Sequence, residues 1–396
     1  MARRLKKPYR MILKTITVIV VFVVLKWLWV TISTMGHGTF EGEKTEILRR
    51  RNYLTNKLLV SPEGVLNEMP GGIGSQFQGE WAMYSCSMLS AALTNISILY
   101  PDEREKSVEQ IDKLIEIVMS PEVREYDAAR WDEDPLESWD SEKSHMSYLS
   151  ILAWMISGYK TAGGDDKYDN LYYRLCSTLN WRMRENPTLN LQTYPNEAVY
   201  VPDMLVTLVA LSNFKRQCDD RYLNTINEWL NKAKKEWTDK ETGILKSFLD
   251  YNGTELSEPI KGSYTALICY YLTFVDKDFA HEQYELLKKH FMQRSPFAGI
   301  QEYYDRKCWL GMDIDSGPII FNLSPSGTAF AIGAATYFGD TDFRNSLLKT
   351  GEIAGSTVRG WNTNHYLLAN MALVGEAITL AMRTSVPWHN NFNENK

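Results

Sequence analysis

Apolar residues recur at helical spacing along most of the chain beyond residue 80, which predicts a succession of amphipathic α-helices. The spacing is plain in several segments: Ser107–Met119, Leu149–Tyr159, Leu205–Phe214, Leu223–Trp237, Ala266–Phe274 and Glu282–Phe291. Stretches with the strict alternation of a half-buried strand are few. The sequence therefore predicts an all-α fold.

The predicted helices alternate in character along the chain. Strongly apolar helices are expected to begin near Glu80, Ser144, Pro202, Gly262, Ser324 and Asn364. More charged helices are expected between them, around Lys106–Met119, Tyr168–Arg184, Tyr222–Lys235, His281–Phe291 and Thr341–Lys349. Repetition of one helical hairpin indicates a repeat architecture. Because the links are irregular and rich in glycine, we expect the hairpins to close into an (α/α)6 toroid; an open solenoid of helix pairs is the alternative.

The N-terminal segment has the pattern of a membrane-spanning helix. It is almost wholly apolar and follows a basic stretch, and Trp27 and Trp29 lie near its far end, where an aromatic belt would be. The basic flank predicts a cytoplasmic N-terminus, with the rest of the chain in the periplasm or outside the cell. A cleaved signal peptide is the alternative to this signal-anchor, but no A-x-A site follows. The expected organisation is a basic cytoplasmic tail (1–10), a transmembrane anchor (11–34), a connector (35–79) and the toroid domain (80–396).

Composition narrows the range of partners. The net charge is −6, so the chain lacks the basic footprint of a nucleic-acid-binding protein. The 12 Trp, 22 Tyr and 14 Phe exceed what is usual; such side chains build cores and also line sugar sites. The 5 cysteines are scattered and form no C-x-x-C pair, so we expect neither a metal cluster nor a disulfide framework. We expect no cofactor and no metal, since Asp313 and Asp315 alone are weak grounds for a calcium site.

The inner helices of a toroid all begin at the same end, so the residues at their starts meet in one cleft. The most unusual of these starts is Gly311–Ala335, where Asp313 and Asp315 lie in a Gly/Pro loop that leads into an Ala-rich helix. The positive ends of the helices favour anions and developing negative charge in such a cleft. A tight helix–helix contact behind a solvated acidic loop is the alternative interpretation of this stretch.

Four residues at these starts are candidates for acid–base catalysis: His145, Glu197, Asp203 and Asp315. A capping or core role is the alternative for His145, and an N-cap role for Asp203. Glu197 opposite Asp315 would suit inverting glycoside hydrolysis, which needs an acid and a base with room for water. The same pair with His145 would suit elimination or hydration of an alcohol. The candidates for substrate binding are Tyr194, Tyr200, Tyr264, Asp313, Trp361 and His365.

Several familiar catalytic motifs are missing from the sequence. The chain contains no P-loop, no dinucleotide-binding glycine pattern and no H-E-x-x-H. Ser324 and Ser326 lie outside any G-x-S-x-G context, which argues against a serine hydrolase.

The chain resembles the linalool dehydratase/isomerase family over roughly residues 80–375. Ser144–Tyr168 looks like the family's His-Leu-Asn-Leu-Met…Gly-Leu-Tyr segment, and Tyr194–Leu211 falls where the family has a Cys-Glu-Pro-Asp-Asn loop. Trp237–Phe291 follows the family pattern, and Asp313–Asp340 resembles its Asp-Gly-Gly…Ala segment ending in Gly-Asp. The resemblance is one of pattern, without a short diagnostic motif. It implies an (α/α)6 toroid.

The resemblance also implies dehydration, hydration or isomerisation of an alcohol, with the family's catalytic histidine on His145. The family's two active-site cysteines fall near Tyr194 and Asp203, and neither position is a cysteine here. Glu197, Asp203 and Asp315 would then act as the acid–base catalysts.

Three functions remain open at this point. The first is a membrane-anchored enzyme with general acid–base chemistry on an alcohol or sugar hydroxyl. The second is a glycoside hydrolase or polysaccharide lyase at the cell envelope, since six-hairpin toroids host many glycosidases. The third is a non-catalytic protein of the envelope that binds glycans.

Overall fold

The computed structural model describes residues 7–33, 39–70, 74–252, 256, 259–313, 316–369 and 373–388. The α-helices are α1 (Lys7–Ser33), α2 (Phe40–Leu58), α3 (Pro62–Asn67), α4 (Ser75–Leu99), α5 (Arg104–Val118), α6 (Pro121–Trp131), α7 (Met146–Ala162), α8 (Asp169–Glu185), α9 (Val201–Gln217), α10 (Leu223–Glu236), α11 (Gly262–Leu272), α12 (Lys277–Phe291), α13 (Pro325–Tyr337), α14 (Thr341–Gly355) and α15 (Leu373–Arg383). Short antiparallel strand pairs join some of them: β1 (Val199–Tyr200) with β2 (Phe248–Leu249), β3 (Met292–Gln293) with β4 (Gly299–Ile300), β5 (Leu310–Asp313) with β6 (Gly317–Ile320), and β7 (Thr357–Arg359) with β8 (Asn364–Tyr366).

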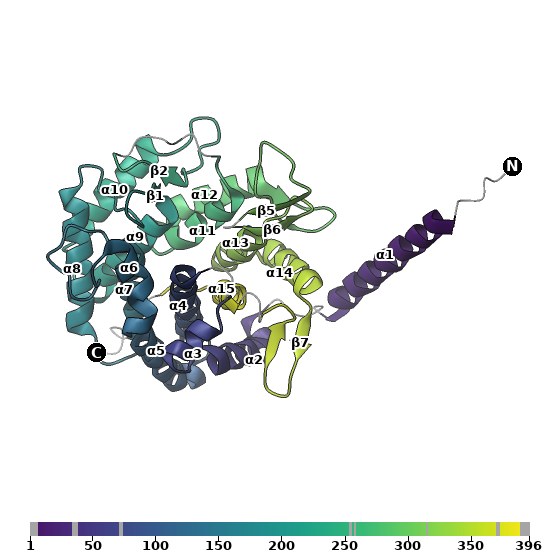
Figure 1. Ribbon diagram of the computed structural model, residues 1–396, viewed down its shortest axis with the longest axis horizontal. Helices are drawn as coiled ribbons and strands as arrows, with labels where there is room; N and C mark the ends of the chain where they lie inside the picture. Colours follow the sequence, from purple (N-terminus) through teal and green to yellow (C-terminus); the bar gives the residue numbers. More distant parts are fainter. Residues whose placement is uncertain are drawn as a thin grey trace.

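The helices form a closed double ring, as predicted. The inner ring runs α4, α7, α9, α11, α13 and α15; each of these helices packs against the next, and α15 packs against α4 (Figure 1). The outer helices α5, α8, α10, α12 and α14 each pack against the inner helix that precedes them in the chain. The chain is thus an all-α (α/α)6 toroid, preceded by an apolar N-terminal helix.

The sixth outer helix comes from the N-terminal side of the ring. Helix α2, in the segment expected to be a connector, packs against α15 and α4 (Figure 1). Buried ion pairs fix it there: Glu43 accepts hydrogen bonds from Arg344 at 2.8 Å and Arg383 at 2.7 Å, and Arg50 reaches Glu376 at 2.6 Å. The segment before residue 80 therefore completes the ring.

The prediction of a helix beginning near Asn364 is wrong. Residues Asn364–Tyr366 form strand β8, which pairs with Thr357–Arg359 in β7, and the sixth inner helix is described from Leu373 onward. The strand pairing supplies backbone partners for this apolar stretch, so it does not need to become helical.

Small residues let the inner helices approach closely. A Cβ at Gly333 on α13 would lie 2.4 Å from the sulfur of Met382 on α15. A Cβ at Gly262, the first residue of α11, would lie 1.9 Å from the carbonyl oxygen of Gln301. A side chain at Gly333 would push α13 and α15 apart, and one at Gly262 would displace the segment that carries Gln301.

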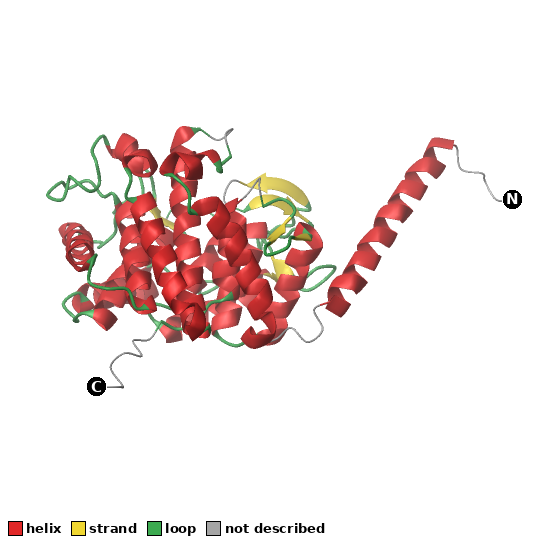
Figure 2. Ribbon diagram, turned by 90° about the horizontal axis from the view of Figure 1, so that it is seen from below, coloured by secondary structure: helices red, strands yellow, loops and turns green. Residues whose placement is uncertain are grey.

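Within the described part of the chain, two helices are long and apolar enough to cross a membrane. The span Phe77–Leu99 in α4 is 83% buried inside the ring, so it is a core helix, whereas Tyr9–Ile32 in α1 is only 6% buried. Helix α1 projects away from the ring (Figure 2) and touches it at α14. There the ammonium of Lys26 donates to the carbonyl of Ile353 and the hydroxyl of Ser356.

Candidate active site

A partly enclosed cavity of about 70 Å³ lies at the end of the ring where α4, α7 and α9 begin. Its lining is mostly polar or aromatic and consists of Glu80, Tyr84, Tyr126, Met146, Ser147, Ser150, Ile151, Thr193, Tyr194, Asp203 and Val206. The volume suffices for a few water molecules or for one group of a larger substrate.

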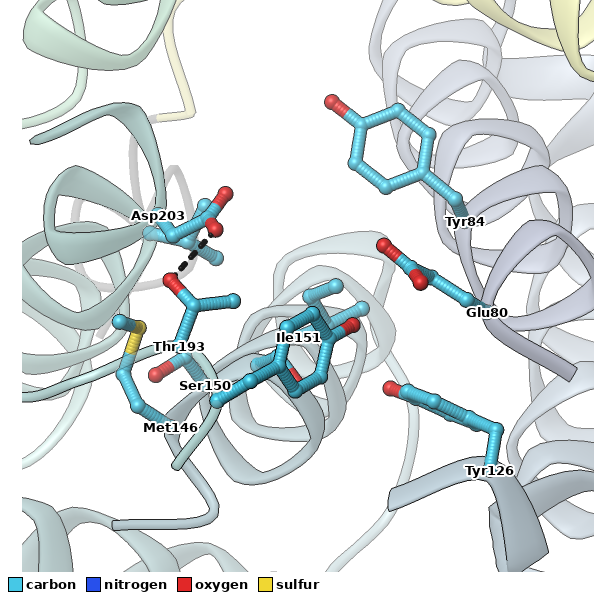
Figure 3. Close-up of a pocket in the computed structure, with 11 residues that line it drawn as sticks. Glu80, Tyr84, Tyr126, Met146, Ser150, Ile151, Thr193 and Asp203 are labelled. Carbon is cyan, nitrogen blue, oxygen red and sulfur yellow. Dashed lines mark hydrogen bonds between the residues drawn. The ribbon is translucent and has the colours of Figure 1, made fainter. Parts of the chain in front are cut away.

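Two carboxyl groups lie on opposite sides of this cavity. Figure 3 shows Asp203 and Thr193 on one side, and Glu80, Tyr84 and Tyr126 on the other. Asp203 belongs to the first turn of α9, and one of its oxygens accepts a 2.8 Å hydrogen bond from the Thr193 hydroxyl. This bond fixes the orientation of the Asp203 carboxylate toward the space that the cavity encloses.

Glu80 has an environment that favours its protonated form. Burial raises the pKa of the Glu80 carboxyl, and the nearby charge of Glu197 raises it further, whereas Arg130 opposes the rise. The guanidinium of Arg130 lies 3.0 Å from a Glu80 oxygen. The net result is a raised pKa, which is the direction that a general acid requires.

Arg130 also holds one wall of the cavity. Helix α6 places its guanidinium carbon 3.7 Å from the ring centroid of Tyr194, a cation–π contact. The buried hydroxyl of Tyr194 lies beside Glu80 and opposes the rise in the pKa of that carboxyl. Arg130 thus connects the acid to the aromatic wall.

Tyrosine hydroxyls supply the remaining polar groups. Burial raises the pKa of Tyr84 well above its ordinary value, and the charge of Asp203 adds to that effect. Its hydroxyl is 3.1 Å from that of Tyr271. Burial likewise raises the pKa of Tyr126 and of Tyr194. All of these phenols stay protonated at neutral pH, so they can donate hydrogen bonds to oxygen atoms of a substrate.

His145 does not face the cavity, contrary to its predicted role as a proton shuttle. The side chain is fully buried, with Nδ1 2.5 Å from Asp127 and Nε2 3.0 Å from Glu133. Both ring nitrogens are therefore engaged by carboxylates beneath the start of α7. The neighbouring Met146 and Ser147 line the cavity instead. The structure favours the core role that the sequence had left as an alternative.

Glu197, Tyr200 and Tyr264 lie around the cavity rather than in its lining. Glu197 is exposed, and its charge reaches Glu80. The ring of Phe248 on β2 contacts Tyr200 on one side and Tyr264 on the other, each at 5.1 Å between centroids. These rings form an aromatic cluster between the starts of α9 and α11.

Of the remaining predicted residues, Asp315 lies outside the described residues. Asp313, Trp361 and His365 do not line the cavity. Asp313 is 2.9 Å from the ammonium of Lys261, and accepts from the Tyr303 hydroxyl at 3.3 Å. Trp361 is 98% exposed at the turn of the β7–β8 hairpin, and His365 stacks on Tyr53 at 4.2 Å. Within the described ranges, no group of three or more His, Cys, Asp or Glu side chains is placed to hold a metal ion.

Two carboxyl groups of interest were not among the predicted site residues. Glu80 is the one charged residue in the sequence of α4, and this isolated acid in a long apolar helix is a signal that could have found it. Glu302 is fully buried where α11 begins, and accepts from the Ser263 hydroxyl at 2.8 Å and its backbone N–H at 3.3 Å. Burial raises the pKa of Glu302 to about 7. No local pattern marks Glu302, because its burial depends on the packing of α11 against the loop that carries it.

Comparison with known proteins supports the fold but assigns the chain to no family. No protein-family profile matches the chain, and no curated protein matches it. The structure is similar to that of a glycoside hydrolase from family 105 of C. acetobutylicum, with a TM-score of 0.51 and 10% sequence identity over 75% of this chain and 92% of that one. At this identity the likeness shows a shared helical toroid. It supports the fold implied by the resemblance to the linalool dehydratase/isomerase family and gives no support to linalool chemistry itself.

Proposed function

We propose that this protein is a membrane-anchored, carbohydrate-active enzyme that cleaves a glycosidic bond by general acid–base catalysis. The observation that carries the proposal is the pair Glu80 and Asp203, two carboxyl groups on opposite sides of a tyrosine-lined cavity (Figure 3). One of the pair has a raised pKa and the other is held by Thr193. Glycosidases need two carboxyl groups in different protonation states.

In the proposed reaction, protonated Glu80 gives its proton to the oxygen of the departing sugar as the C–O bond breaks. Ionised Asp203 accepts a proton from a water molecule whose oxygen forms the new bond to the same carbon. The hydroxyls of Tyr84, Tyr126 and Tyr194 donate hydrogen bonds to the sugar. Arg130 stabilises the Glu80 carboxylate after its proton has left, because its guanidinium lies 3.0 Å from a Glu80 oxygen.

The lining of the cavity favours a sugar over a terpene-like alcohol. Carboxyl, phenol and hydroxyl groups surround the space, and each can pair with the hydroxyls of a carbohydrate. An apolar alcohol would leave these groups without partners, at a cost of about 1–3 kcal/mol for each buried one. Dehydration or isomerisation of an alcohol, as in the linalool dehydratase/isomerase family, remains the competing enzymatic function. A binding protein without turnover is the competing non-enzymatic one.

The decisive experiment uses the full chain in detergent or nanodiscs. It is incubated with a panel of envelope polysaccharides, oligosaccharides and small tertiary alcohols, and products are identified by mass spectrometry. We expect new reducing ends, with a rate that falls at least about a hundredfold in Glu80→Gln and in Asp203→Asn. Glu282→Gln, which changes an exposed acid on the outer helix α12, is the matched control and should turn over normally.

Other outcomes separate the alternatives. A mass change of one water on an alcohol, with sugars untouched, would overturn the glycosidase proposal in favour of dehydratase-like chemistry. Binding of a glycan that weakens in Glu80→Gln, without any product from the unmodified chain, would support a binding protein.

A further inference from the structure

The outward face of the β5–β6 hairpin is wholly apolar. The antiparallel register pairs Leu310 with Ile320 and Met312 with Pro318, so these four side chains share one face. Leu310 is 80% exposed, Met312 78% and Ile320 49%. A solvent-facing side of a hairpin normally carries polar residues. The apolar residues on this face are therefore typical of an interaction surface.

Aromatic side chains extend the same face beyond the strands. Trp309 and Phe321 are both exposed, with ring centroids 6.4 Å apart, and Phe297 follows 5.8 Å from Phe321. The second hairpin, β7–β8, is similar: Trp361 stands at its turn, and Leu367 and Leu368 are exposed just after it. We refer to residues 309–313, 316–321 and 357–368 together as the apolar hairpins.

The apolar hairpins lie on the side of the ring from which α1 leaves (Figure 1). Lys26 of α1 binds the carbonyl of Ile353 and the hydroxyl of Ser356, and strand β7 begins at the next residue, Thr357. Lys349 of α14 lies 4.2 Å from the ring centroid of Trp27. The point where the apolar helix meets the ring therefore adjoins one of the hairpins.

Basic residues accompany the apolar ones. Arg306 and Lys307 precede Trp309 and are exposed, and Arg359 is exposed on β7. Apolar side chains flanked by Trp and by Lys or Arg are typical of surfaces that enter the boundary between headgroups and acyl chains. The cations suit anionic headgroups at that depth.

We propose that the apolar hairpins insert into the surface of the phospholipid bilayer that α1 spans. The aliphatic side chains Leu310, Met312 and Leu367 favour acyl chains over a glycan, which would use the flat faces of aromatic rings. The proximity of α1 favours the bilayer over a second protein. This inference rests on the proposed membrane anchor, not on the proposed chemistry.

The insertion would fix the orientation of the ring at the membrane. Strand β6 leads directly into α13, one of the inner helices that begin at the cavity end of the ring. With α1 as one attachment and the hairpins as others, that end would be held beside the bilayer surface. A glycan carried by a membrane lipid would then be the substrate within reach.

Photochemical labelling of the full chain tests the insertion. The protein is reconstituted in vesicles of phosphatidylcholine with a minor share of phosphatidylglycerol, containing a phosphatidylcholine with a diazirine on its acyl chain. Lipid adducts are mapped by mass spectrometry after irradiation. We expect adducts on the peptides that hold Trp309–Met312 and Trp361, in addition to those on α1.

Exposed aromatic residues across the ring serve as the internal control. Tyr173 and Trp181 on α8 are exposed too, on the side opposite α1 (Figure 1), and should carry no adduct. The double substitution Leu310→Ser with Met312→Ser should lower labelling of its hairpin severalfold, and Tyr173→Ser should change nothing there. Adducts confined to α1 would overturn the inference, as would equal labelling of α8. Neither result depends on turnover, so failure here is distinguishable from failure of the proposed chemistry.

Discussion

Arg130 and Glu80 form a 3.0 Å ion pair in the wall of the cavity, although burial still raises the pKa of the acid. The pair joins α6 to α4 and so makes the protonation of Glu80 depend on a residue 50 positions away. Its strength therefore sets the pH range over which Glu80 can serve as a proton donor.

Replacing Arg130 should move the alkaline limb of the pH profile. A general acid loses activity as pH rises through its pKa, and the guanidinium keeps the pKa of Glu80 lower than burial alone would. In Arg130→Gln we expect the alkaline limb of kcat/KM to move upward by about one pH unit. The control is Arg184→Gln, which breaks an exposed ion pair with Glu228 and should leave the limb in place. An unmoved limb in Arg130→Gln would exclude Glu80 as the titrating acid.

Replacing His145 should affect stability rather than chemistry. Its removal leaves the buried Asp127 without the imidazole, although the Ser147 hydroxyl still lies 3.2 Å away, and the cost is about 3–5 kcal/mol. His145 also has a φ of 47°, in the left-handed region, which asparagine tolerates better than alanine does. We expect His145→Ala to lower the unfolding midpoint more than His145→Asn, with both retaining turnover per folded molecule. Loss of turnover at an unchanged midpoint would restore the proton-shuttle role.

Glu43 should confer resistance to acid. Burial opposes its ionisation, but hydrogen bonds and charges from Arg344 and Arg383 prevail and lower its pKa from 4.5 to about 2. A carboxyl group whose pKa is lowered by folding stabilises the folded state at pH values above its ordinary pKa. This stabilisation is lost as the pH falls toward the pKa of the group in the folded state. That contribution is about 3 kcal/mol. The free energy of unfolding, measured with urea at several pH values, should fall between pH 4.5 and about 2 in the unmodified chain. In Glu43→Gln this fall should be absent. A slope identical to that of the unmodified chain would contradict the ion-pair account.

Glu302 should have the opposite effect in a different pH window. Burial raises the pKa of Glu302 from 4.5 to about 7. Its contribution to the stability of the folded chain is therefore greatest below pH 4.5 and is lost as the pH rises through 7. Glu302→Gln keeps an oxygen for the Ser263 hydroxyl and removes the buried charge. We expect the variant to be more stable than the unmodified chain by about 3 kcal/mol at pH 8 and equal to it at pH 4. Equal stability at both values would show that Glu302 is not desolvated.

The ring could be predicted from the sequence because inner and outer helices differ in composition. The expected outer helix Tyr168–Arg184 and the observed α8, Asp169–Glu185, differ by one residue at each end. The sixth outer helix was not assigned, because it lies far from its inner partner in the chain. Helix α2 is amphipathic and charged, and only its contacts with α15 show that it belongs to the ring.

The candidate site was predicted in part. Tyr194 and Asp203 line the cavity, because residues at the start of an inner helix point toward the centre of that end. Glu80 was passed over as a site residue although it starts an inner helix too, and His145 was chosen although it turns inward. Spacing along a helix predicts the positions of Cα atoms. It does not predict that a buried carboxylate such as Asp127 will form a hydrogen bond with the His145 side chain.

The position of α2 in the ring has a consequence for biosynthesis. Glu43 leaves the ribosome early, but its partners Arg344 and Arg383 follow 301 and 340 residues later. At ordinary rates of translation this delay is on the order of tens of seconds. During that time Glu43 lacks the two arginines with which it pairs in the folded ring. Closure of the ring at α15 therefore comes late in synthesis, and a chain truncated before α15 would leave Glu43 without Arg383.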